Sequence, residues 1–213
     1  MDLKLYSAAR SNAAHRVRIA LNLKGLAYDY VAVDLAGAEQ HKAAFRAVNP
    51  QRLVPALEAD GRVLTQSLAI LEWLEETHPA PPLLPTGPWE RAIVRSMAQI
   101  VVGDIHPLIN LRILRALGAM RVSEADQHTW MARWINDGMQ ALELMVIAHG
   151  RGWAFGDEPG LADCCLIPQV AGAERWGVSL EPYPAIRAVA ERAAEHPAFA
   201  AAHPKQQPDM PAV

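Results

Sequence analysis

The chain has few cysteines, and their arrangement excludes a disulfide-stabilised scaffold. Among its 213 residues there are two, the neighbours Cys164 and Cys165, which are too few and too close together for a disulfide framework. No His or Cys stands at metal-ligand spacing from them, which argues against a metal or redox pair. We therefore expect both cysteines to be reduced within a helix, and we expect no metal site.

The chain also lacks long apolar runs and an excess of basic residues. No run approaches the ~20 apolar residues that a membrane-spanning helix needs. The first residues, MDLKLY, enter a strand pattern directly and lack the profile of a signal peptide, which favours the cytoplasm. The net charge of -3 leaves no basic excess to neutralise nucleic-acid phosphates. We expect neither a membrane nor a nucleic acid as partner.

Residues 1–78 alternate between strand and helix patterns, as in a compact α/β domain. Apolar periodicity and turn signals predict strands at residues 3–6, 28–33, 56–58 and 62–64. The same signals predict helices at residues 12–24 and 67–76, and a short helix or turn at 39–47. The resulting order, β-α-β-α-β-β-α, is the pattern of a thioredoxin-like fold.

Residues 79–88 contain five prolines and a glycine, which form a stiff linker rather than a helix or central strand. Only helical patterns follow, so we expect residues 89–213 to form an all-helical domain. Its helices are predicted at residues 89–117 with an interruption near Pro107, and at 124–148, 161–176 and 183–195. From His203 onward we expect an irregular tail.

Residues 49–57, NPQRLVPAL, place a Val54-Pro55 step just before a strand. A turn there, whose X-Pro bond can be cis at modest cost, leaves the N–H and C=O of Val54 open to an extended peptide. Gln66 and Ser67 then open a helix whose first N–H groups can bind a carboxylate. A peptide clamp beside a carboxylate site suits a small anionic peptide, and glutathione is the obvious candidate.

Five segments resemble zeta-class glutathione transferases, and the resemblance covers essentially the whole chain. A thioredoxin-like domain joined by a proline linker to an all-helical domain is the architecture of cytosolic glutathione transferases. The resemblance implies a homodimer that uses glutathione to isomerise maleylacetoacetate to fumarylacetoacetate in aromatic amino-acid catabolism. The matching segments are SNAAHRVRIAL at residues 11–21, NPQRLVPAL at 49–57, DIHPLINLR at 104–112, LADCCLIPQV at 161–170 and HPKQQPD at 203–209.

The resemblance assigns the catalytic centre to the start of the first helix. Ser11 is by position a helix N-cap, and the family match adds a hydroxyl that hydrogen-bonds the glutathione sulfur. Free thiols have a pKa near ~8.5, so a hydroxyl donor and the helix dipole would favour the thiolate. Relatives often carry a second serine and then a cysteine here. This chain has Asn12, whose amide still donates, and Ala13, so any mechanism that needs that cysteine is excluded.

Tyr6 is a rival thiol activator, but its place inside a strand favours a packing role. For glutathione itself, the resemblance assigns Val54 to the cysteinyl backbone, and Gln66 and Ser67 to the γ-glutamyl carboxylate. Gln40 and Gln51 are candidates for the glycyl end, with plain surface exposure as the alternative for each.

Arginines suit the family's dicarboxylate-like substrates because a guanidinium binds a carboxylate in bidentate fashion. Arg10 would lie beside the sulfur, and Arg112 and Arg175 are further candidates. The alternative for each is a solvated surface arginine or one paired with a nearby acid, and that alternative is favoured for Arg112 and Arg175. His106 precedes the proline that interrupts the long helix, so it either faces the substrate or only lines a kink. Asp163 belongs to an incomplete helix-capping segment, which favours a buried structural role.

Three alternatives to maleylacetoacetate isomerisation remain open. Maleylpyruvate isomerisation is the nearest, although Leu111 is apolar where a maleylpyruvate enzyme would be expected to carry another arginine. General glutathione conjugation and non-catalytic glutathione binding are the other two.

Overall fold

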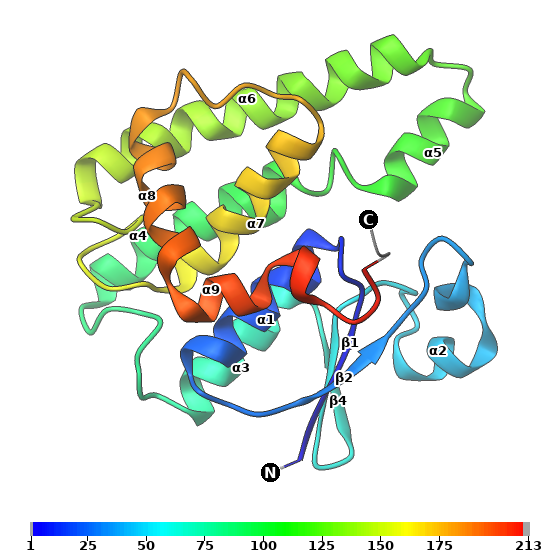
Figure 1. Ribbon diagram of the computed structural model, residues 1–213, viewed down its shortest axis with the longest axis horizontal. Helices are drawn as coiled ribbons and strands as arrows, with labels where there is room; N and C mark the ends of the chain where they lie inside the picture. The colour runs from blue at the N-terminus through cyan, green and yellow to red at the C-terminus, as the bar shows by residue number, and fades with distance from the viewer. Residues whose placement is uncertain (1, 211–213) are drawn as a thin grey trace. The chain divides into compact units, whose positions relative to one another are not determined.

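A mixed sheet forms the centre of the first part of the chain (Figure 1). The computed structural model describes residues 2–210, and within that range four strands pair in the order β2-β1-β3-β4. Strands β1 and β2 are parallel, whereas β3 is antiparallel to both β1 and β4. The strands are β1 (Leu3–Ser7), β2 (Asp29–Ala32), β3 (Ala56–Ala59) and β4 (Arg62–Thr65).

Helices cover the sheet because each contributes one apolar face. Helix α1 (Asn12–Leu23) packs against α3 (Ser67–Thr77), and their buried side chains include Val17, Leu21 and Leu74. The short η1 (Glu39–His41) and α2 (Ala43–Val48) follow β2, and Phe45 of α2 joins a cluster of buried residues with Ala8, Val33 and Val54. This element order confirms the predicted β-α-β-α-β-β-α pattern.

The described residues divide into two compact units whose boundaries differ from the predicted domains. Residues 2–83 and 194–210 form one unit, and residues 84–193 form the other. The sequence predicts that residues 89–213 form a single helical domain. In the structure, residues 194–210 belong to the first unit, because α9 (Pro197–Ala202) packs against α1. Arg18 and Asn22 of α1 donate to the carbonyls of Ala202 and Ala198, at 3.0 and 2.9 Å.

Helix α9 is an element that the sequence analysis missed. His196 accepts the N–H of Ala198 at the helix start, and Pro197 occupies the first helical position, which is a recognisable start signal. The tail expected to be irregular contains a short 3-10 helix, η3 (Pro204–Gln206), and its residues 211–213 lie outside the described range.

The second unit is helical. The predicted long helix over residues 89–117 is divided into α4 (Pro88–Gln99), a π-helical segment η2 (Ile100–Ile105) and α5 (Leu111–Ala119), so the interruption near Pro107 is confirmed. Ile105 lies against Gly138 of α6 so closely that a Cβ at Gly138 would meet it. The remaining helices are α6 (Glu124–His149), α7 (Leu161–Arg175) and α8 (Pro184–Glu195).

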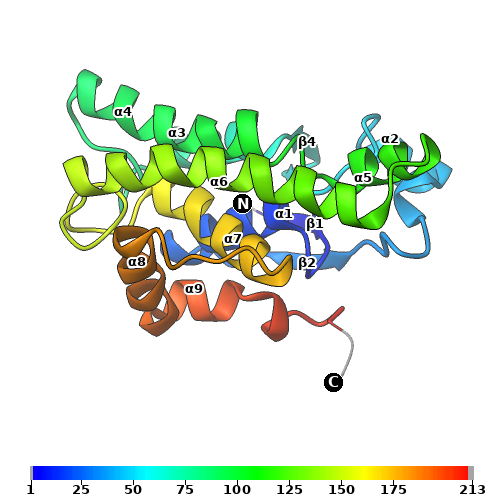
Figure 2. The ribbon, with the colours of Figure 1, turned by 90° about the horizontal axis from the view of Figure 1, so that it is seen from above.

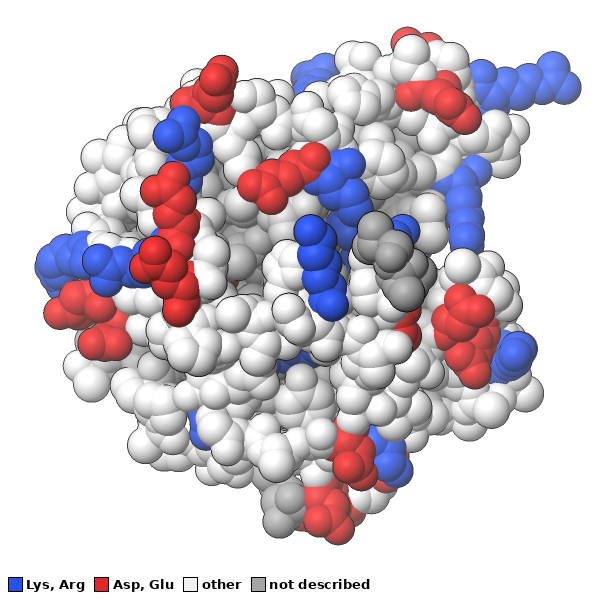
Figure 3. Space-filling model, in the orientation of Figure 1, with Lys and Arg blue, Asp and Glu red and all other residues white. Residues whose placement is uncertain are grey.

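Helix α7 is almost wholly buried and packs against α4 and η2; Figure 2 shows it beside α6. Cys164 and Cys165 both lie buried within α7, as predicted. Among residues 2–210 no helix is long and apolar enough to cross a membrane. On the face drawn in Figure 3, Lys and Arg side chains are interspersed with Asp and Glu.

Asp163 has the structural role that its sequence context favours. Its carboxylate is fully buried and accepts the N–H groups of Ala154, at 2.8 Å, and Gly160, at 2.9 Å. These bonds attach the preceding loop to the first turn of α7. Burial raises the pKa of Asp163 to about 7, although both N–H groups act to lower it.

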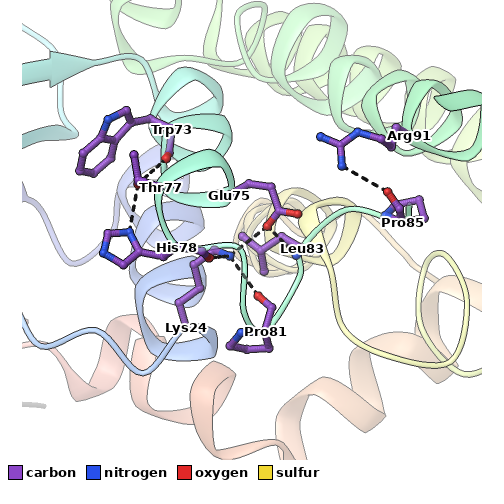
Figure 4. Close-up of polar contacts among 9 residues, drawn as sticks. All are labelled: Lys24, Trp73, Glu75, Thr77, His78, Pro81, Leu83, Pro85 and Arg91. Carbon is purple, nitrogen blue, oxygen red and sulfur yellow. Dashed lines mark hydrogen bonds and ion pairs between the residues drawn. The ribbon is translucent and has the colours of Figure 1, made fainter. Parts of the chain in front are cut away.

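A buried ion pair fixes the start of the linker (Figure 4). Lys24 Nζ lies 2.9 Å from Glu75 Oε2 and donates to the carbonyls of His78, at 2.6 Å, and Pro81, at 3.0 Å. Glu75 also accepts the N–H of Leu83 at 2.8 Å. The pair therefore joins the end of α1, α3 and the linker, which explains why the first unit extends to residue 83 rather than 78.

Removing Lys24 is expected to destabilise the protein strongly. In Lys24→Met, Glu75 would remain buried without its cation, which typically costs about 3 kcal/mol. Urea unfolding of Lys24→Met measures this loss. The control is Asp137→Asn, which removes the exposed Arg133–Asp137 pair and should change stability by less than about 1 kcal/mol. Equally small changes in the free energy of unfolding of both variants would contradict the stabilising role of the Lys24–Glu75 pair.

The raised pKa of Asp163 leads us to expect an unusual pH dependence of stability. Its pKa is about 7 in the folded state and 3.8 in the unfolded chain, so between these values the folded state holds a proton that the unfolded state has lost. Stability contributed by this group therefore falls as pH rises. Between about pH 5 and pH 6.5 wild type should lose about 1–2 kcal/mol relative to Asp163→Asn, measured by urea unfolding. A wild-type loss no larger than that of Asp163→Asn would contradict the raised pKa.

Candidate active site

Ser11 is both a helix cap and an available hydroxyl donor. It precedes α1, and its Oγ accepts the N–H of Ala14 at 3.2 Å. A serine hydroxyl carries one proton and two lone pairs, so capping uses an acceptor position and leaves the O–H free to donate. Ser11 can therefore cap the helix and still donate a hydrogen bond to a sulfur, which are the two roles considered from the sequence. The side chain is half-buried at the N-terminal end of α1, where the helix dipole favours negative charge.

The loop before Ser11 is held by a buried arginine, Arg18, whose role the sequence does not predict. Arg18 donates to the carbonyls of Ala8, at 3.3 Å, and Ala9, at 3.0 Å, and to Ser7 Oγ at 3.0 Å. Burial lowers the pKa of this guanidinium. The other two catalytic candidates flank Ser11: Arg10 is exposed, and Asn12 is buried at the first position of α1.

Val54 has the backbone arrangement that the sequence predicts. It lies just before β3, its bond to Pro55 is cis, and its side chain packs in the cluster with Ala8 and Phe45. Across residues 2–210, no hydrogen bond is found to the N–H or the carbonyl of Val54. Both groups are thus available to a peptide backbone.

Ser67 and Gln66 form the start of α3 with two features that favour an anion. Ser67 is buried, and its Oγ accepts from Arg16 Nη1 at 3.1 Å, which places a buried cation beside the first N–H groups of the helix. Gln66 has φ 71° and ψ 116°, a strained conformation for a residue with a side chain. Arg16 is a second residue whose part in the site the sequence analysis missed.

Gln51 and Gln40 differ in their surroundings. Gln51 is exposed, and its Oε1 accepts from Gln66 Nε2 at 2.6 Å, so these two predicted residues do meet. Gln40 is buried, so the alternative of plain exposure is wrong for it. Its buried Oε1 has no hydrogen-bond partner in the described part of the chain. Such an oxygen costs about 1–3 kcal/mol, which a donor on a ligand would offset.

Tyr6 is occupied elsewhere, as its position in β1 suggests. Its hydroxyl donates to Glu58 Oε2 at 3.1 Å, and its ring meets that of Phe45 at 6.1 Å. Burial, followed by the bond to Glu58, raises the pKa of Tyr6. It is therefore poorly placed to activate a thiol.

The substrate-binding candidates lie in the second unit. His106 is half-buried directly after η2, where its N–H donates to the carbonyl of Val101 in π-helical fashion. Such π-helical turns are frequent at functional sites. Arg112 is exposed at the second position of α5, a helix capped by Asn110, whose Oδ1 accepts the Arg112 N–H at 3.0 Å. Arg175 is exposed at the end of α7.

Comparison with known proteins identifies the family. Residues 5–82 match the model of the glutathione S-transferase N-terminal domain. The chain is 48% identical over 213 residues to a maleylacetoacetate isomerase of Pseudomonas aeruginosa, covering 99% of this chain and 100% of that protein. It is 50% identical over 210 residues to a maleylpyruvate isomerase of Ralstonia sp, covering 97% and 99%. The chain belongs to the zeta class of glutathione transferases.

Solved structures of this class agree with the predicted architecture. A holo structure of a maleylpyruvate isomerase, described as a bacterial zeta-class glutathione S-transferase, has a TM-score of 0.95 at 49% identity and covers 98% of this chain and 100% of that one. The maleylacetoacetate isomerase of Anaeromyxobacter dehalogenans 2CP-1, with glutathione bound in its active site, has a TM-score of 0.90 at 48% identity, covering 99% and 98%. The predicted thioredoxin-like and helical fold is confirmed.

Because Gln66 has a strained backbone, replacing it with glycine distinguishes a role in binding glutathione from a role in stability. Gln66→Gly relieves the positive φ, so stability should be kept or rise by up to about 1 kcal/mol. Glutathione affinity should nevertheless fall, because the side chain and the fixed geometry of the helix start are lost. Urea unfolding and calorimetric titration with glutathione measure the two effects. Arg121→Gly, at another positive φ, is the control and should leave affinity unchanged. Unaltered affinity in Gln66→Gly would contradict its role.

Proposed function

We propose that this protein is a glutathione-dependent cis–trans isomerase that converts maleylacetoacetate to fumarylacetoacetate. Ser11 carries the proposal, because its acceptor side is occupied by Ala14 while its proton stays available at the start of α1. Full-length identity of 48% to a maleylacetoacetate isomerase and of 50% to a maleylpyruvate isomerase supports the reaction class.

The residues present fit glutathione. The open backbone groups of Val54 would pair with the cysteinyl backbone, as an added strand does. The start of α3, with Ser67 and the neighbouring Arg16, would hold the γ-glutamyl carboxylate. The orphaned Oε1 of Gln40 would accept an N–H near the glycyl end, and Gln51 would support Gln66.

Bound glutathione supplies a thiolate that adds reversibly to a double bond conjugated to a ketone, so that the bond can rotate. The protein's own groups prepare this chemistry. Ser11 and the dipole of α1 favour the ionised sulfur, and Asn12 adds an amide donor. Arg10 would orient a substrate carboxylate beside the sulfur. His106, Arg112 and Arg175 would bind the substrate's polar groups.

Maleylpyruvate isomerisation is the second candidate, and similar identity to both kinds of isomerase does not separate them. Leu111, which is half-exposed beside Arg112, favours maleylacetoacetate because it offers no further charge to a shorter dicarboxylate. We also propose that the protein works as a cytoplasmic homodimer. The exposed apolar side chains of Trp89, Leu144 and Ile147 support self-association.

The function is tested by progress curves with maleylacetoacetate and with maleylpyruvate, each with and without catalytic glutathione. Turnover far beyond the glutathione supplied, and faster for maleylacetoacetate, is the expected result. Faster turnover of maleylpyruvate would reassign the substrate. Glutathione binding without turnover of either compound would contradict isomerisation and favour conjugation or simple binding.

Ser11→Ala is expected to separate catalysis from binding. Loss of a single donor to a charge that matters in the reaction should lower kcat by about 10²–10³-fold. The dissociation constant of glutathione should change little, because Val54, Gln66 and Ser67 remain. Ser67→Ala is the matched control and should instead weaken glutathione binding by about tenfold. Full activity in Ser11→Ala would contradict the assignment.

A further inference from the structure

The C-terminal segment of the chain returns to the loop that carries Ser11. Asp209 Oδ2 accepts the backbone N–H of Ala9 at 2.9 Å, a contact between residues 200 positions apart. Its other oxygen, Oδ1, accepts the hydroxyl of Tyr30 in β2 at 2.6 Å. Both carboxylate oxygens are therefore used within the first unit, one on the loop and one on the sheet.

The backbone of this loop is fixed from two sides. Arg18 binds the carbonyls of Ala8 and Ala9 from α1, while Asp209 binds the N–H of Ala9 from the C-terminal segment. The N–H of Ser11 donates to the carbonyl of Ala8 at 3.0 Å, which closes the turn. Hydrogen bonds to charged groups are stronger than those between neutral groups. The cation of Arg18 and the anion of Asp209 together hold Ala8 and Ala9, which directly precede Arg10 and Ser11.

Tyr30 lies near both charges, because its hydroxyl donates to Asp209 and the Arg18 guanidinium acts on it electrostatically. Burial, and then its bond to Asp209, raises the pKa of Tyr30, so the phenol stays protonated and keeps donating to the carboxylate. Arg18 also donates to Ser7 Oγ at the end of β1 and to the carbonyl of Ala202 in α9. The strand end, the loop and the C-terminal segment thus form one hydrogen-bonded network.

We propose that Asp209 is a positioning residue that places the Ser11 hydroxyl for thiol ionisation; this inference rests on the proposed function of Ser11. We assign Asp209 no contact with the reacting atoms, because its two carboxylate oxygens are used on Ala9 and Tyr30. It acts through the backbone of Ala9, two residues before Ser11. Displacement of a catalytic group by about 1 Å can lower a rate by about 10²-fold, so the position of this loop determines how well Ser11 serves the sulfur.

The test variant is Asp209→Asn, which keeps the shape of the side chain. An amide has one oxygen, so it cannot accept from Ala9 and Tyr30 as the carboxylate does. We expect kcat/KM to fall about 10–100-fold with glutathione affinity nearly unchanged. The amide protons of Ala9 and Ser11, followed by NMR hydrogen exchange without ligand, should exchange faster. Asn22→Ala, which loosens α9 from α1 without touching the loop, is the control and should show neither effect.

A double-mutant cycle with Ser11→Ala distinguishes positioning from general destabilisation. If Asp209 acts through Ser11, Asp209→Asn changes kcat/KM little once Ser11 is alanine. Independent, multiplying losses would overturn the proposal, as would unchanged amide exchange at Ala9. If Asp209→Asn does not fold, Tyr30→Phe replaces it in the cycle, with a smaller loss expected and the same criterion. If wild type proves inactive, the proposed function fails, and the amide-exchange comparison alone decides whether Asp209 fixes the loop.

Discussion

The buried guanidinium of Arg18 is the interaction on which the arrangement of the first unit depends. It binds three carbonyls and a hydroxyl that belong to the end of β1, the loop before Ser11 and α9. Burying a charge without partners costs several kcal/mol, so the Arg18 guanidinium can be buried only where nearby carbonyls and hydroxyls accept its hydrogen bonds. The requirement forces strand, loop and C-terminal segment into one fixed geometry.

The proposed function places an anionic peptide and its thiolate beside groups that carry full or partial positive charge. Two helices, α1 and α3, begin near functional candidates, and each start offers N–H groups and a favourable dipole. Arg16 adds its charge beside Ser67. The open backbone of Val54 and the orphaned oxygen of Gln40 supply the neutral contacts. At Ser11 the same hydroxyl that caps α1 also keeps its proton for the proposed contact with the sulfur.

Local features of this fold were predictable because their causes are local. Apolar periodicity and turn residues predict the strands and helices of the first unit, and Pro107 predicts the break after η2. The role of Arg18, the burial of Gln40 and the contact of Asp209 with Ala9 were not predictable from spacing. The contacts of Arg18 and Asp209 join residues up to 200 positions apart, and the burial of Gln40 depends on the surrounding fold. Only the folded chain brings these groups together. The short α9 was missed although Pro197 gives a local start signal, because its alanines carry little periodic signal.

The most direct measurement is the pKa of the glutathione thiol bound to the wild-type protein, followed by the ultraviolet absorbance of the thiolate as pH is varied. A free thiol has a pKa near ~8.5. If the Ser11 loop stabilises the ionised sulfur, the pKa of the bound thiol will lie at least about one unit lower. A bound thiol with the pKa of the free peptide would contradict the role given to Ser11 and to the network that holds its loop.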